Sequence, residues 1–210
     1  MNEIRTIIEE VKDEIIEKKS RFIGYFFPCD SALSFEKRLQ EIKKEHPQAR
    51  HHCYAYRIKE QIVNERYSDD REPAKTAGFP ILEVLKGKEL LNCAIVVVRY
   101  FGGTLLGTGG LSRAYSEASV AAVSKAQIVL QEEALCFWIR MEYSLLNKLD
   151  YFIEKEELAV QEKKYDEHVH YELILKKESS EMYLEKLKDL MNGQVEIEEN
   201  GKKIIFSKTY

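Results

Sequence analysis

Residues 94–115, AIVVVRYFGGTLLGTGGLSRAY, carry the strongest structural pattern in the sequence. A run of apolar and β-branched residues comes first, which is typical of a strand buried on both faces of a sheet. Five glycines follow within residues 102–110, and a helical pattern then continues to about residue 125. The segment predicts a central strand, a glycine loop and a helix that packs on the sheet.

The glycine loop is a candidate site for an anion. Glycines permit positive φ and close backbone approach, and the first turn of a helix offers free N–H groups. Arg99 and Tyr100 end the strand beside this loop. Two known phosphate motifs are not matched, because Thr108 stands where a P-loop needs lysine and Ser112 replaces the last glycine of the dinucleotide pattern. The alternative is a loop that serves close packing of strand and helix.

A second polar cluster lies in residues 68–78, SDDREPAKTAG. Asp69, Asp70 and Glu72 are carboxylates of the kind that bind divalent cations or act as acid and base. Carboxylates before Pro73 also suit a solvated turn or the start of a helix. We predict no metal site, because this segment supplies fewer oxygen ligands than a hard cation needs.

The sequence His51-His52-Cys53 is the third cluster. On a strand, His51 and Cys53 face one way and His52 the other, so the three cannot easily share one metal. A Cys/His nucleophilic pair is one interpretation. A buried cysteine beside a hydrogen-bonding histidine is the other.

Charge and glycine divide the chain into two parts. Residues 1–130 hold 20 Lys and Arg against 18 Asp and Glu, whereas residues 131–210 hold 12 against 18. Seven of the ten glycines fall between residues 78 and 110. We therefore predict two domains, residues 1–130 and 131–210, with a boundary between residues 125 and 134.

The expected elements are mixed in both parts. In the first part, the patterns predict strands at residues 11–18, 21–27, 51–58 and 93–100 and helices at 31–45, 73–86 and 111–125; a helix over residues 4–16 is an alternative for the start. The second part predicts a strand at 134–143, a helix at 145–157, strands at 158–165 and 168–176, a helix at 179–191, and two short strands in 195–206 joined at Asn200-Gly201. The order β-α-β-β-α-β is the ferredoxin-like arrangement.

The cellular location is predicted from the lack of a membrane-spanning stretch, a secretory leader pattern and paired cysteines in the sequence. Its apolar stretches are far shorter than the roughly 20 residues that cross a bilayer, and residues 1–20 are too charged for a secretory leader. The four cysteines are widely spaced and include no CxxC pair, which favours free thiols in a reducing compartment. We expect a cytoplasmic protein that does not contact membranes.

Four segments together resemble the IMPACT/YigZ family: Ser20-Arg21-Phe22, HHC at 51–53, SDDxEPAxTAG at 68–78, and VVVRYFGGxLLGxGGLxxAY at 96–115. The resemblance implies an α+β protein with an N-terminal fold like domain 2 of ribosomal protein S5. It also implies the smaller ferredoxin-like domain that bacterial members append. Arg71 and Lys75 stand where the family often has glycine.

Eukaryotic relatives in this family regulate translation, and the family offers no established reaction for bacterial members. The resemblance therefore implies a translation-associated regulatory protein that binds RNA or the ribosome, or a protein partner, without a cofactor or a predicted catalytic residue. The alternative is an enzyme or binding protein for a phosphorylated or anionic small molecule at residues 102–110. The sequence gives no oligomeric state.

We expect the polar groups of the first part to converge on one cleft with an Arg99–carboxylate pair. The predicted ligand-binding residues are His51, His52, Asp69, Asp70, Glu72, Thr76, Gly78, Arg99, Tyr100, Gly102, Gly103, Gly107, Gly109 and Gly110.

Overall fold

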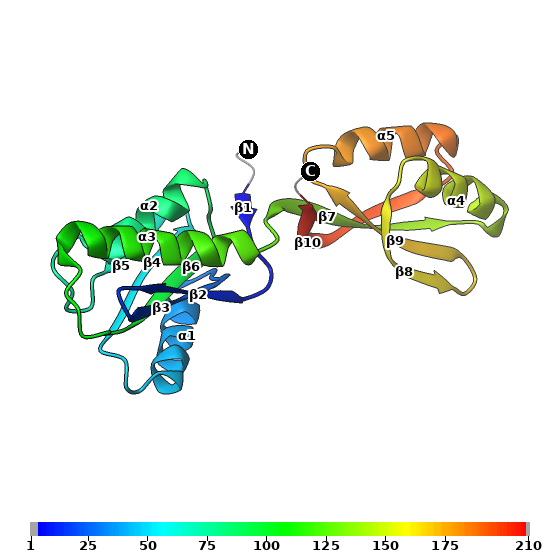
Figure 1. Cartoon of the computed structure of the whole chain (residues 1–210). Coiled ribbons are helices and arrows are strands. Elements are labelled where there is room, and N and C mark those ends of the chain that lie inside the picture. Colours follow the sequence, from blue (N-terminus) through cyan, green and yellow to red (C-terminus); the bar gives the residue numbers. More distant parts are fainter. Residues whose placement is uncertain (1–3, 209–210) are drawn as a thin grey trace. The chain divides into compact units, whose positions relative to one another are not determined.

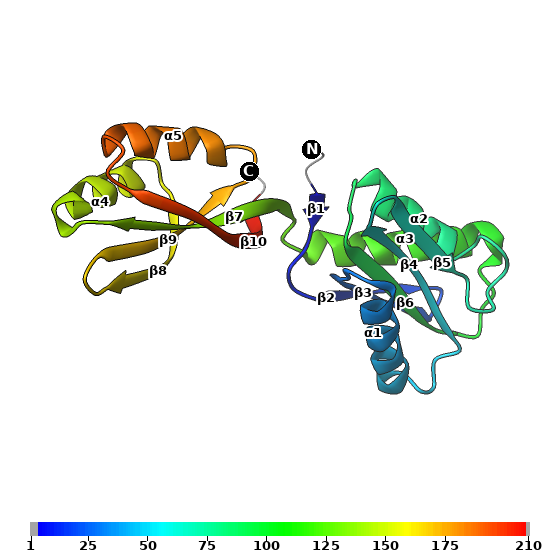
Figure 2. The ribbon, with the colours of Figure 1, turned by 180° about the vertical axis from the view of Figure 1, so that it is seen from behind.

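The computed structural model describes residues 4–208 and mixes helices with antiparallel sheets. The chain divides into two compact units, one extending to Leu130 and including Lys208, the other formed by Gln131–Ser207. Figures 1 and 2 show the elements of each unit from opposite sides. No helix among the described residues is long and apolar enough to cross a bilayer.

The first unit is built on a five-stranded sheet with the order β2–β3–β6–β4–β5, in which all neighbours are antiparallel. Its elements are β1 (Ile4–Thr6), β2 (Val11–Glu17), β3 (Ser20–Pro28), α1 (Ala32–Glu45), β4 (His51–Lys59), β5 (Val63–Ser68), α2 (Gly78–Gly87), β6 (Cys93–Tyr100) and α3 (Gly107–Lys125). Strand β6 is central and is buried from Cys93 to Arg99, as its apolar run predicts.

Helices cover both faces of this sheet. Helices α2 and α3 pack on one face, where Phe22, Val97 and Tyr115 belong to one core cluster. Helix α1 packs on the other face, where Phe35 and Val96 belong to a second cluster. Ser31 begins α1 with a capping box shared with Ser34, which satisfies backbone N–H groups at the helix start.

The second unit has the element order β-α-β-β-α-β. Its elements are β7 (Val129–Met141), a 3₁₀ turn (Tyr143–Leu145), α4 (Leu146–Lys155), β8 (Ala159–Tyr165), β9 (Val169–Lys176), α5 (Ser180–Leu190) and β10 (Glu196–Lys208). Strand β9 lies between β7 and β8, and β10 also pairs with β7. A third core cluster, which includes Ile139, Leu149 and Leu187, joins the sheet to its helices.

Two local predictions were wrong, and one strand was not predicted. Helix α2 begins at Gly78 rather than Pro73, and Pro80 fits because the first turn of a helix has no internal partner for its N–H groups. Asn200-Gly201 does not form a turn, since β10 continues through it and Asn200 Nδ2 donates to Glu172 Oε1. Strand β5 was missed because its sequence is polar at the sheet edge.

The structure also distinguishes the strand and helix alternatives for the start of the chain and shows the state of the cysteines. Residues 4–16 form β1 and most of β2 instead of a helix. All four cysteines are free and buried.

We predict that residues 1–130 fold without the rest of the chain, because this unit holds its own two core clusters. The purified fragment should unfold cooperatively in a urea titration followed by circular dichroism. A fragment without a sigmoidal transition would contradict an independent domain.

Candidate functional site

Sheet register brings the predicted residues to one end of the first sheet. Arg99 on β6 lies opposite His51 on β4, and opposite Phe22 on β3. Because side chains alternate along a strand, Arg99, His51 and Cys53 share the face that α2 and α3 cover. The loop between β5 and α2 lies against this face.

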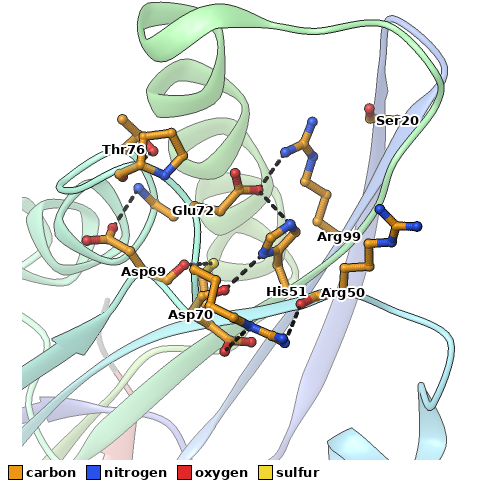
Figure 3. A network of polar contacts seen from close by, with 12 residues as sticks. Ser20, Arg50, His51, Asp69, Asp70, Glu72, Thr76 and Arg99 are labelled. Carbon is orange, nitrogen blue, oxygen red and sulfur yellow. Dashed lines mark hydrogen bonds and ion pairs between the residues drawn. The ribbon is translucent and has the colours of Figure 1, made fainter.

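Glu72 in that loop forms the centre of the site. Its Oε1 accepts a hydrogen bond from Arg99 Nη1 at 2.6 Å and another from Tyr115 OH on α3 at 2.8 Å. His51 Nε2 lies 3.9 Å from the same oxygen. The side chains of Arg99 and Glu72 are 6% and 4% exposed, so this is a buried ion pair (Figure 3). The predicted Arg99–carboxylate pair is present.

Asp69 and Asp70 lie in the same loop as Glu72, but their carboxylates bind backbone N–H groups and not Arg99. Asp69 accepts hydrogen bonds from the backbone N–H groups of Lys75, Ala77 and Gly78, and thereby caps the start of α2. Asp70 Oδ2 accepts from the backbone N–H of His52 at 2.7 Å. The two carboxylates differ from Glu72 because they bind backbone N–H groups in and beside their own loop.

Thr76 and Gly78 complete the same loop. Thr76 Oγ1 donates to the backbone carbonyl of Pro73 at 2.7 Å. Gly78 packs so closely on the Ser68 backbone that a Cβ there would lie 2.6 Å from it. Both residues therefore hold the loop together instead of facing the Arg99–Glu72 pair.

His52 and Tyr100 also lie away from the pair, since each is one residue from a member of the cluster and so faces the α1 side. Tyr100 OH is 2.8 Å from His46 Nδ1. His52 is 7% exposed, its Nε2 is buried without a hydrogen-bond partner among the described residues, and burial lowers its pKa. These two residues belong to a separate polar cluster under α1.

Glycines in the loop at residues 102–110 are required for two different reasons, close backbone packing and positive φ. Gly102 donates its N–H to Ser20 Oγ, and a Cβ at this position would lie 2.0 Å from the carbonyl carbon of Lys19. Gly103 and Gly107 have φ of 84° and 70°, in the left-handed region. Gly109 and Gly110 lie in the first turn of α3, where no described side chain caps the helix.

Cys53 is unsuited to nucleophilic chemistry. It is fully buried, with Sγ 3.0 Å from the backbone oxygen of Asp69 and 3.4 Å from Tyr115 OH. Burial raises the pKa of the Cys53 thiol far above neutral pH. The interpretation as a buried cysteine is therefore favoured over a Cys/His pair. Among residues 4–208, no group of His, Cys, Asp and Glu is arranged to hold a metal ion.

Sequence reasoning missed two residues of this site. Tyr115 bonds Glu72 from α3, and Ser20 bonds the glycine loop from β3. Both are fully buried polar side chains. Each ends or begins a motif of the sequence, but a tyrosine at helical spacing is ordinarily a core residue.

Known proteins match both units. The Impact N-terminal domain matches residues 18–123, and a domain of unknown function, DUF1949, matches residues 139–194. IMPACT family member YvyE of Bacillus subtilis is 34% identical, covering 92% of this chain and 89% of its own length. IMPACT family member YigZ of Escherichia coli is 30% identical over 91% of this chain and 92% of its own. The chain belongs to the IMPACT family.

A solved structure supports the arrangement of the elements. A crystal structure of a hypothetical protein has a TM-score of 0.63 and 29% identity, and the match covers 94% of this chain and 97% of that one. The chain is thus a mixed α+β protein of two domains.

The buried pair predicts strong coupling between Arg99 and Glu72. Arg99→Ala should lower the free energy of unfolding by about 3–5 kcal/mol, because it leaves a buried carboxylate without its cation. Glu72→Gln added to Arg99→Ala should cost much less than the sum of the two single changes. Urea unfolding of the four proteins gives the coupling, and additive effects would contradict the pair.

A second prediction concerns Lys75, whose φ is 61°. Lys75→Gly should raise the free energy of unfolding by about 0.5–1 kcal/mol, since glycine adopts this conformation without the cost that a Cβ brings. Lys75→Ala is the control, because it removes the exposed side chain but keeps the Cβ. Equal stability of the two variants would mean that backbone conformation is not the cause.

Proposed function

We propose that this chain is a translation-associated regulatory protein that binds RNA or the ribosome through its first unit. Membership of the IMPACT family supports the link to translation that the sequence resemblance implies. The proposal includes a cytoplasmic location. It also includes an S5-domain-2-like fold for residues 1–130 and a ferredoxin-like fold for residues 131–210.

One unpaired donor of Arg99, its Nε, carries the proposal. Its Nη1 bonds Glu72, whereas its Nε is buried with no hydrogen-bond partner among the described residues. Buried donors are almost always satisfied, so an unpaired one in a polar cluster points to a missing partner. The guanidinium lies 5.4 Å from the centroid of the Phe22 ring and 5.7 Å from that of the Phe101 ring. The planar fork of arginine suits phosphate groups of RNA, although only 6% of this side chain is exposed.

The surroundings of Arg99 support binding over covalent chemistry. Cys53 and Tyr115 are buried, and burial raises the pKa of both side chains well above neutral pH. Phe101, by contrast, is 49% exposed and Leu105 is 84% exposed. The loop next to Arg99 therefore presents apolar side chains to solvent, as a binding loop does.

Sedimentation with ribosomes tests this function. The full chain should pellet with purified bacterial 70S ribosomes through a sucrose cushion at low salt. Arg99→Lys should weaken that association by about tenfold, because lysine keeps the charge beside Glu72 but loses the planar fork. Arg57→Lys is the matched control, since Arg57 also pairs with a carboxylate, Glu65, at the other end of β4.

Two results would contradict the proposal. The chain would remain in the supernatant, or Arg57→Lys would weaken association as much as Arg99→Lys. A rise in melting temperature with ATP or inorganic phosphate, without ribosome association, would favour the small-anion alternative at residues 102–110.

A further inference from the structure

Exposed cations from three separate segments gather at one end of the first sheet. Lys18 and Lys19 form the turn between β2 and β3, and Arg21 follows at the start of β3. Arg50 immediately precedes β4, and Arg71 lies in the loop after β5. All five side chains are exposed. We call this set, Lys18, Lys19, Arg21, Arg50 and Arg71, the basic rim.

Register and contacts show that these segments are neighbours. Arg21 pairs with Tyr100 across the β3–β6 ladder, and its guanidinium lies 5.5 Å from the centroid of the Tyr100 ring. The backbone of Lys19 touches Gly102. On the other side of β6, His51 pairs with Arg99, which places Arg50 beside the end of β6. Figure 3 shows Ser20, Arg50 and Arg99 at this end.

Arg71 is tied to the same end of the sheet. Its Nη2 donates to the backbone carbonyl of Arg50 at 3.0 Å. Its Nε lies 3.7 Å from Asp70 Oδ1, but the side chain remains 79% exposed. The loop after β5 thus adds its cation to those of the two strand starts.

The rim keeps an excess of positive charge. Arg21 is neutralised by two hydrogen bonds to Glu14, and Glu17 is a further acid at this end. Lys18, Lys19 and Arg50 form no ion pair in the described part of the chain. The whole chain has a formal net charge of −4, so this positive region stands apart from the average surface.

Three of these cationic residues have a positive φ angle, which is unfavourable for residues other than glycine. Lys18, Lys19 and Arg71 have φ of 43°, 66° and 70°. A two-residue hairpin turn of this kind prefers Asn-Gly, and lysine there gains nothing from packing when it is exposed. Each of these positions therefore costs stability that a glycine would not, and the exposed side chain does not offset the cost by packing.

We propose that the basic rim is the phosphate-contacting surface for single-stranded RNA, with Phe101 stacking on a base; this rests on the proposed function. Phe101 follows the end of β6 and is 49% exposed, so part of its ring is open to a base. A duplex keeps its bases stacked inside, whereas single strands leave them available to aromatic side chains. The combination of arginine, lysine and one open ring favours a single strand over an acidic protein.

Fluorescence anisotropy with a labelled 12-nucleotide single-stranded RNA tests the surface in the full chain. The rim variant combines Lys18→Asn, Lys19→Gly, Arg50→Gln and Arg71→Gly, which remove four charges and relieve the three strained positions. The control variant combines Lys37→Gln, Lys59→Gln, Lys86→Gln and Lys88→Gln, at exposed lysines outside the rim. Melting curves should show that both variants are folded.

The salt dependence gives the expected size of the effect. Each phosphate contact to a single strand contributes about 0.7 to the slope of log K against log salt. Loss of about three contacts should lower the slope by about 2, or roughly a hundredfold in affinity at 0.1 M salt. The control variant should bind within about threefold of the unmodified chain. Phe101→Leu should weaken binding by about tenfold without changing the slope.

The outcomes separate this surface from the function on which it rests. If the unmodified chain binds RNA and the rim variant binds equally well, the rim proposal is wrong while RNA binding stands. If both variants lose affinity equally, general charge is responsible, and the rim is again wrong. If the unmodified chain binds no RNA but pellets with ribosomes, the rim proposal is wrong while the proposed function stands; if it does neither, both proposals fail. Tighter binding of labelled poly-glutamate than of RNA would assign the rim to an acidic protein instead.

Discussion

The first unit depends on one buried carboxylate, that of Glu72. A single oxygen of this side chain holds Arg99 from the central strand and Tyr115 from α3, with His51 of β4 close by. Burying a charge is expensive unless it is paired and hydrogen-bonded, so the loop, the strand and the helix must meet at this point for any of the three groups to be satisfied. The loop that carries Glu72 has no apolar side chain of comparable burial before Ala77, so polar contacts such as this one anchor it to the sheet.

The other acids of the loop explain why that anchor can work. Asp69 binds the N–H groups at the start of α2, and Asp70 binds the backbone at the start of β4. These contacts hold the backbone on the N-terminal side of Glu72 and at the start of α2, and the Glu72 side chain points inward between them. In sequence, the three carboxylates are typical of a metal or acid–base site. In the structure, two of them bind backbone N–H groups and the third binds Arg99, and together they hold one loop in place. Its positive-φ positions include Arg71 and Lys75, and glycine adopts this conformation without the cost that a Cβ brings.

The sequence predicted those elements whose apolar residues recur with the period of a strand or a helix. The apolar run of β6, the amphipathic face of α1 and the β-α-β-β-α-β order of the second unit follow from side-chain alternation and helical spacing. Strand β5 could not be found this way, because an edge strand with polar residues has no apolar period. The partners of Glu72 were out of reach for a different reason. Tyr115 and Glu72 are 43 positions apart, and only the packing of α3 over the loop brings them together.

Alternation along the strands also separates what the sequence places side by side. Arg99 faces α3 and Tyr100 faces α1, so adjacent residues belong to different polar clusters. Both clusters nevertheless reach the same end of the sheet, where β6 stops and β3 and β4 begin. The interior of this end is closely packed, since the Arg99–Glu72 pair is buried and Gly102 leaves no room for a Cβ. The cations around its edge are exposed and lie on turns that gain little from packing. The buried polar pair and the exposed cations therefore lie at one end of the same sheet, which is why both proposals concern this end of the first unit.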